Sequence, residues 1–160
     1  MSGNRYAGLR AQIVREQVLA DFFAGAATAA ALAAHLAGTE ERIAERTSLV
    51  RIEDMAGEFS VTREMLIALC DAVLTRDLQP DALSTVGLAL MASDRFIWDG
   101  EQILGDVIAD WSCPEINYPL NPESVRLFRA WLTEEKPYPG KPVLPVGNKQ
   151  VVSVRRKERV

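Results

Sequence analysis

The sequence predicts a mainly α-helical fold: a compact bundle of about five to six helices, with a small β-hairpin as an option near residues 48–61. Three observations lead to this prediction. Apolar residues recur at i, i+3, i+4 and i+7 through several segments. Helix-starting residues precede those segments, and short connections with Pro or Gly join them, as in helical bundles. The 160 residues, 48% of them hydrophobic, suit one globular domain.

The first part of the chain predicts two helices. One is expected over residues 5–24, with Gly25 at its C-terminal end. Thr28 is expected to cap a second, Ala-rich helix that ends at Gly38. This stretch is apolar, but an aspartate and His35 interrupt it and many of its residues are alanines. We therefore expect neither a membrane span nor an export signal, and we expect a cytoplasmic protein.

The next segments are less regular. Residues 39–47 are charged and ambiguous, with another helical turn as one interpretation. Residues 48–61 lose the helical spacing, and their apolar residues flank a loop that contains Gly57. This pattern fits either a small β-hairpin or an extended loop.

The middle of the chain predicts four further helices. In the first of them the apolar positions follow the helical repeat at Leu66, Leu69, Cys70, Val73 and Leu74. The four expected starts are Thr62, Pro80, the pair Asp99 and Gln102, which resembles a capping box, and Asn121-Pro122.

Charge divides the chain into a domain and a tail. Residues 1–135 hold 11 Lys and Arg against 21 Asp and Glu, a net charge of −10, and residues 136–160 hold 7 against 1, a net charge of +6. Within the first part, residues 53–123 carry 14 acidic side chains against three arginines, a net charge of −11. We therefore predict a helical domain over 1–135 and a Pro-rich basic tail over 136–160 that is extended or disordered.

Familiar catalytic patterns are absent from the sequence. It has one histidine, His35, and two cysteines, of which Cys70 is expected in the core. It has no Gly-rich phosphate loop, His-x-x-x-His pair or Cys-x-x-Cys pair. The sequence thus indicates no catalytic residue, no metal ligand and no cofactor, and it favours a noncatalytic role. Nucleic-acid binding is not favoured either, because the helix expected over residues 81–92 offers no positive charge.

One predicted helix carries a row of carboxylates. Asp99, Asp106 and Asp110 fall within about 40° of one another on a helical projection, opposite an apolar face that includes Trp111. We expect these carboxylates on the exposed side of the helix. Three interpretations stay open: a solvated face, a surface for a positively charged protein, or a site for a divalent cation.

The loops on either side of that helix add aromatic residues to the acidic ones. Asp94, Trp98 and Asp99 precede the helix, and Glu115 and Tyr118 follow it. Aromatic anchors bordered by charged residues are typical of protein interfaces. Trp111 is expected in the core, whereas Trp98 and Tyr118 fit either the core or a surface. The predicted partner-binding residues are Asp94, Trp98, Asp99, Asp106, Asp110 and Glu115.

The segment 59–132 also carries a resemblance, strongest at residues 69–74 (LCDAVL), 92–99 (ASDRFIWD) and 111–120 (WSCPEINYPL). It resembles small helical bacterial proteins of unassigned role whose general character is that of immunity proteins, which bind and block a partner toxin. The resemblance covers under half of the chain and includes no active-site motif. It implies a bacterial protein-binding module and assigns no residue.

These observations predict a noncatalytic protein-binding module, of the immunity or inhibitor type, that engages a basic protein partner through an acidic helical face. Two alternatives stay open. One is an assembly subunit whose basic tail contacts neighbouring copies, since tail and domain carry opposite charges. The other is a carboxylate-dependent enzyme that uses a divalent cation held by Asp94, Asp99 and Asp106.

Overall fold

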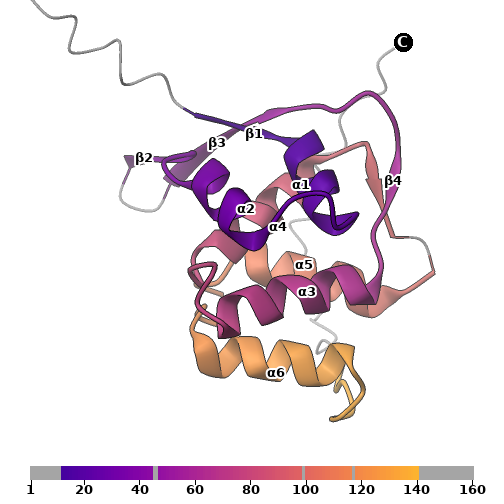
Figure 1. The fold of residues 1–160 in the computed structure, drawn as a ribbon. Helices are drawn as coiled ribbons and strands as arrows, with labels where there is room; N and C mark the ends of the chain where they lie inside the picture. Colours follow the sequence, from indigo (N-terminus) through magenta and orange to yellow (C-terminus); the bar gives the residue numbers. More distant parts are fainter. Residues whose placement is uncertain (1–11, 45–46, 99, 117, 141–160) are drawn as a thin grey trace, which may run out of the picture.

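The computed structural model describes residues 12–44, 47–98, 100–116 and 118–140 (Figure 1). This part of the chain is mainly helical, as predicted, with two small sheets. Its elements in order are β1 (Ile13–Arg15), α1 (Glu16–Phe23), α2 (Ala29–Leu36), β2 (Glu40–Ala44), β3 (Thr47–Glu53), β4 (Phe59–Ser60), α3 (Arg63–Leu74), α4 (Ala82–Ala92), β5 (Phe96–Ile97), α5 (Gln102–Ser112) and α6 (Pro122–Leu132).

The strands differ from the sequence-based prediction. The hairpin joins β2 to β3 and therefore lies earlier than residues 48–61. β1 occupies residues that were expected in the first helix, and it pairs in parallel with β3, which gives the strand order β1-β3-β2. The second difference has a clear cause: the partner of β1 is about 38 residues away in the sequence (Ile13 with Arg51), so the local pattern could not reveal it.

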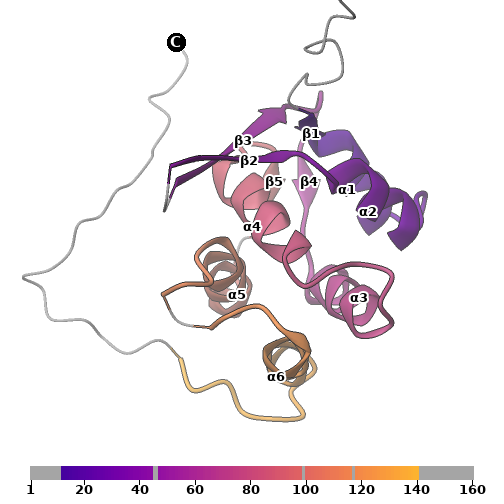
Figure 2. The ribbon, with the colours of Figure 1, turned by 90° about the vertical axis from the view of Figure 1, so that its left-hand side faces the viewer.

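The three-stranded sheet has one covered and one open face. Val14 is fully buried, and Val50 and Ile52 pack against the core, whereas their neighbours Ile13 and Leu49 are exposed. Side chains alternate between the two faces of a strand, so this pattern assigns the faces. Helices α1, α2 and α4 all lie on the covered side (Figures 1 and 2).

The helices form two packed pairs beneath the sheet, α4 with α5 and α3 with α6 (Figure 2). Local signals set several of their ends. Thr28 accepts a hydrogen bond from Ala31 N at the start of α2, and Asn121 and Ser124 form a capping box at the start of α6. The capping box predicted at Asp99 and Gln102 was wrong, because α5 begins at Gln102 with Glu101 at the N-cap position.

One core contact fixes the α4–α5 pair. Gly87 of α4 lies so close to α5 that a Cβ atom there would stand 2.8 Å from Ser112 N, 3.0 Å from Ile108 O and 3.0 Å from Trp111 Cβ. The nearby Trp111 is fully buried and meets Phe128 of α6 edge-on, at 6.1 Å between ring centres. These residues join three helices into one core.

A buried carboxylate ties α1 to the loop after β3. Glu16, the first residue of α1, is fully buried, and its Oε1 accepts a hydrogen bond of 3.0 Å from Met55 N. Its Oε2 has no hydrogen-bond partner among the described residues. An acidic side chain in the first turn of a helix is favoured by the helix dipole, which helps to place Glu16 at this position.

His35 ties α2 to β1. Its Nε2 accepts a hydrogen bond of 3.0 Å from the backbone N–H of Arg15. Only neutral imidazole can accept through Nε2. Burial, and then the nearby positive charge of Arg15, lower the pKa of His35 below its ordinary value of about 6.5.

We expect this contact to make the fold less stable at mildly acidic pH. The lowered pKa means that the unfolded chain binds more protons at His35 than the folded chain does, so stability falls as pH drops below about 6.5. Urea unfolding at pH 7.5 and pH 5.5 should show a lower midpoint at the acidic pH. His35 is the one histidine in the sequence, so His35→Gln should reduce the difference in urea midpoint between the two pH values. If the variant shows the same difference as the wild-type chain, groups other than His35 cause the pH dependence.

Candidate functional site

The predicted exposed carboxylate face on α5 is wrong for Asp110, which is only 3% exposed. The reason lies in the helical projection. Ile103, 8% exposed, falls about 20° from Asp110 on α5, so a second arc of the helix is buried in addition to the one around Trp111. The Asp110 side chain therefore cannot serve as a surface contact for a partner.

Asp106 is half-buried and engaged within the molecule. The hydroxyl of Tyr138 donates a hydrogen bond of 2.7 Å to Asp106 Oδ2, and the Tyr138 ring packs on Trp131 of α6 with 5.2 Å between ring centres. Burial, the Asp106 hydrogen bond and the charges of Asp106 and Asp110 raise the pKa of Tyr138 well above its usual value. Tyr138 therefore keeps its proton at neutral pH and donates a hydrogen bond to Asp106.

The start of the predicted tail is thus attached to the domain. The backbone N–H of Lys136 donates a hydrogen bond of 3.2 Å to Ala130 O, at the end of α6. Two residues later, Tyr138 contacts Asp106 of α5 and Trp131 of α6. Residues 137–140 are neither helix nor strand, as predicted for a Pro-rich segment. The rest of the tail, 141–160, lies outside the described residues.

The remaining predicted residues do not form one patch. Asp94 and Glu115 are exposed and Trp98 is half-buried, while Asp99 lies outside the described residues. Trp98 precedes α5 and Glu115 follows it, so α5, with a length of roughly 16 Å, separates them. Asp94 and Trp98 lie on either side of the two-residue strand β5, so these two predicted residues are near each other.

Trp98 forms a wall of a surface groove of about 440 Å³. The groove lies where the ends of β4 and β5 lead into α3 and α5, and it is lined by Ser60, Val61, Thr62, Arg63, Glu64, Ile97, Trp98, Glu101 and Leu104. The indole can lie against α5 because residue 105 is a glycine: a Cβ atom there would stand 3.2 Å from Trp98 Nε1.

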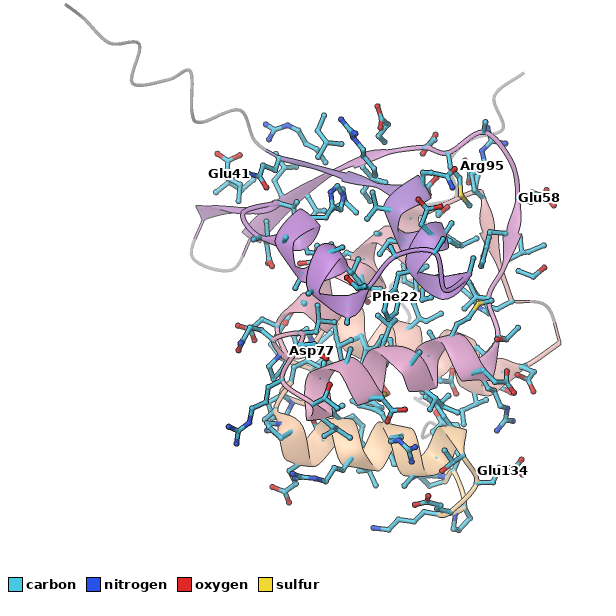
Figure 3. The ribbon with its side chains drawn as sticks, in the orientation of Figure 1. Phe22, Glu41, Glu58, Asp77, Arg95 and Glu134 are labelled. Carbon is cyan, nitrogen blue, oxygen red and sulfur yellow. The ribbon has the colours of Figure 1, made fainter. Side chains whose placement is uncertain are left out.

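Arg63 is held in place at this groove by three acceptors. Its Nε lies 3.0 Å from Glu101 Oε1, and its Nη1 lies 3.2 Å from Leu132 O and 3.5 Å from Glu134 Oε1. Arg63 thereby connects the starts of α3 and α5 to the end of α6, where Figure 3 shows Glu134. These contacts engage the Arg63 guanidinium within the molecule. Glu64, which also lines the groove, is exposed to solvent.

Sequence reasoning missed Arg63, Glu64 and Glu101 as site residues. Arg63 and Glu64 are in the first turn of α3, and Glu101 is the N-cap of α5. The helix dipole favours the two glutamates at these positions, and Arg63 is held there by its contacts with Glu101 and the end of α6. The sequence contains the two helix starts, but it does not show that β4 and β5 pair and bring them together.

The described residues include no group of three His, Cys, Asp or Glu side chains that could hold a metal ion. Asp99, one of the three carboxylates in the cation hypothesis, lies outside that part of the chain. Within the same residues, no helix is long and apolar enough to cross a membrane. Neither a protein-family model, nor a curated protein, nor a solved structure matches this chain.

Proposed function

We propose that the chain is a noncatalytic protein-binding module that engages a basic protein partner at the groove beside Trp98. The observation that carries this proposal is the position of Trp98 as the half-buried wall of a groove of about 440 Å³. A tryptophan on a concave surface is a frequent anchor of protein interfaces. Among the predicted contact residues that the structure describes, it is also the one that lines this groove.

The groove suits an arginine or lysine side chain of the partner. The indole face of Trp98 offers a cation–π contact, and the exposed carboxylate of Glu64 offers charge-assisted hydrogen bonds, whereas Glu101 is already paired with Arg63. The net charge of −11 over residues 53–123 would also attract a basic protein and speed its association. An immunity or inhibitor role is the form of this proposal that the sequence resemblance suggests, and the cytoplasm is its expected location.

Comparative affinity capture from an extract of the native cell tests the proposal. The wild-type chain should recover one stoichiometric basic protein, and recovery should fall as salt concentration rises. Trp98→Ala should reduce the recovery at least tenfold, a loss of about 1.4 kcal/mol or more in binding free energy. Glu64→Lys should reduce it as well, because it reverses an exposed charge on the rim.

Met91→Ala is the matched control, because Met91 is 50% exposed and does not line the groove. It should leave recovery unchanged. Circular dichroism should show that all three variants remain folded. Absence of any stoichiometric partner, or equal recovery by the Trp98→Ala and wild-type chains, would contradict the proposal.

A further inference from the structure

His35 holds the strand β1 from the side of helix α2. Its Nε2 accepts the backbone N–H of Arg15 at 3.0 Å, between residues 20 positions apart in the sequence. A backbone N–H has one proton to donate, so this hydrogen bond ties β1 to α2 and is separate from the pairing of β1 with β3. His35 is half-buried, so protons from solvent can reach its ring.

β1 has few other anchors. It contains three residues, and within the described part of the chain it pairs only with β3, at the edge of the sheet (Figure 1). Of its three side chains, only that of Val14 is buried. The ion pair of Arg15 with Glu53 joins two exposed side chains, and such pairs contribute little. A segment with so few buried contacts can open locally, without unfolding of the whole domain.

The helix that follows β1 is held by contacts of its own. Leu19 and Ala20 of α1 are buried in the core, and Glu16 accepts its hydrogen bond from the backbone of Met55. None of these contacts involves His35. We therefore expect α1 to keep its place when β1 leaves the sheet.

The elements packed against α2 carry few other ionisable groups. α2 has no charged side chain besides His35, and α4 has none. α1 carries Glu16 and Asp21, which each accept a hydrogen bond elsewhere. Burial, and then the positive charge of Arg15 on β1, lower the pKa of His35.

We propose that β1 is an acid-released strand: protonation of His35 breaks its hydrogen bond with Arg15 and lets residues 13–15 leave β3 while the helices stay folded. Imidazolium carries an N–H on both ring nitrogens, so no rotation of the ring restores an acceptor. The groove beside Trp98 is lined by no residue of β1, α2 or β3, so the proposal is independent of the proposed function.

Native-state hydrogen exchange of the full chain, followed by NMR, tests the proposal on the Arg15 amide itself. Its protection factor should fall about tenfold from about pH 7.5 to about pH 5.0, because the open strand binds the proton that the closed strand excludes. Low urea concentrations should change this protection little, since local opening exposes little surface. The amide of the fully buried Leu69 in α3 should lose protection steeply with urea, because its exchange requires global unfolding.

Two variants identify the titrating group. His35→Gln offers Arg15 an acceptor that does not titrate, so the protection of the Arg15 amide should change less than about twofold between the two pH values. Glu53→Gln is the matched control, because it removes the ion pair of Arg15 and leaves His35 in place; the tenfold change should persist. Arg15 protection that is equal at both pH values, or that follows urea as steeply as that of Leu69, would overturn the proposal. A tenfold change that persists in His35→Gln would overturn it as well.

Discussion

Trp111→Ala is expected to lower the free energy of unfolding by about 3–5 kcal/mol. Trp111 is fully buried between α4, α5 and α6, against Phe128 and next to Gly87. Truncation leaves a cavity that three helices cannot close without losing their other contacts. Urea unfolding followed by circular dichroism measures the loss.

Trp111→Phe provides the control for this variant. The indole Nε1 of Trp111 is buried with no hydrogen-bond partner among the described residues, so phenylalanine removes a polar group that contributes no hydrogen bond while it keeps an aromatic ring in place. We expect a loss of less than about half of that for alanine. Equal losses for the two variants would show that the ring contacts with Phe128 contribute little.

Much of the helical fold could be predicted from the sequence. The predicted starts at Thr28, Thr62 and Asn121 coincide with the N-caps of α2, α3 and α6, because capping and apolar periodicity depend on residues close together in the chain. The burial of Cys70 and Trp111 was predicted for the same reason.

The sheets could not be predicted in the same way. β1 has three residues and β4 and β5 have two each, too few to show an alternating pattern. The partner of Ile13 is Arg51, and the partner of Phe59 is Phe96. Their pairing is decided by the tertiary structure, in which the rings of Phe23, Phe59 and Phe96 pack together.

The candidate site was predicted only in part, for a related reason. A helical projection of α5 treats the helix as covered on one side, but Ile103 and the contact of Tyr138 with Asp106 cover a second side. The carboxylate row was therefore not a free surface. Trp98, for which the sequence left core and surface both open, is half-buried and lines the groove. Its neighbours Glu64 and Glu101 come together only through the β4–β5 pair, which the sequence does not reveal.

Gly87→Ala is expected to destabilise the protein by about 1–3 kcal/mol, although the same change in an exposed helix would stabilise it by about 1 kcal/mol. The sign is reversed because the new Cβ would meet the backbone of α5, at 2.8 Å from Ser112 N and 3.0 Å from Ile108 O. Backbone atoms in a packed helix cannot turn aside, so α4 and α5 must move apart, with loss of contacts around Trp111.

Gly105→Ala is the matched control, because Gly105 is also helical and its new Cβ would meet only the side chain of Trp98, at 3.2 Å from Nε1. That half-buried side chain can shift by a few tenths of an ångström into the groove. We expect Gly105→Ala to change the free energy of unfolding by less than about 1 kcal/mol, with both variants measured by urea unfolding. A larger loss for Gly105→Ala than for Gly87→Ala would mean that the α4–α5 contact is looser than these distances indicate, and that Trp98 is held more rigidly than a binding groove requires.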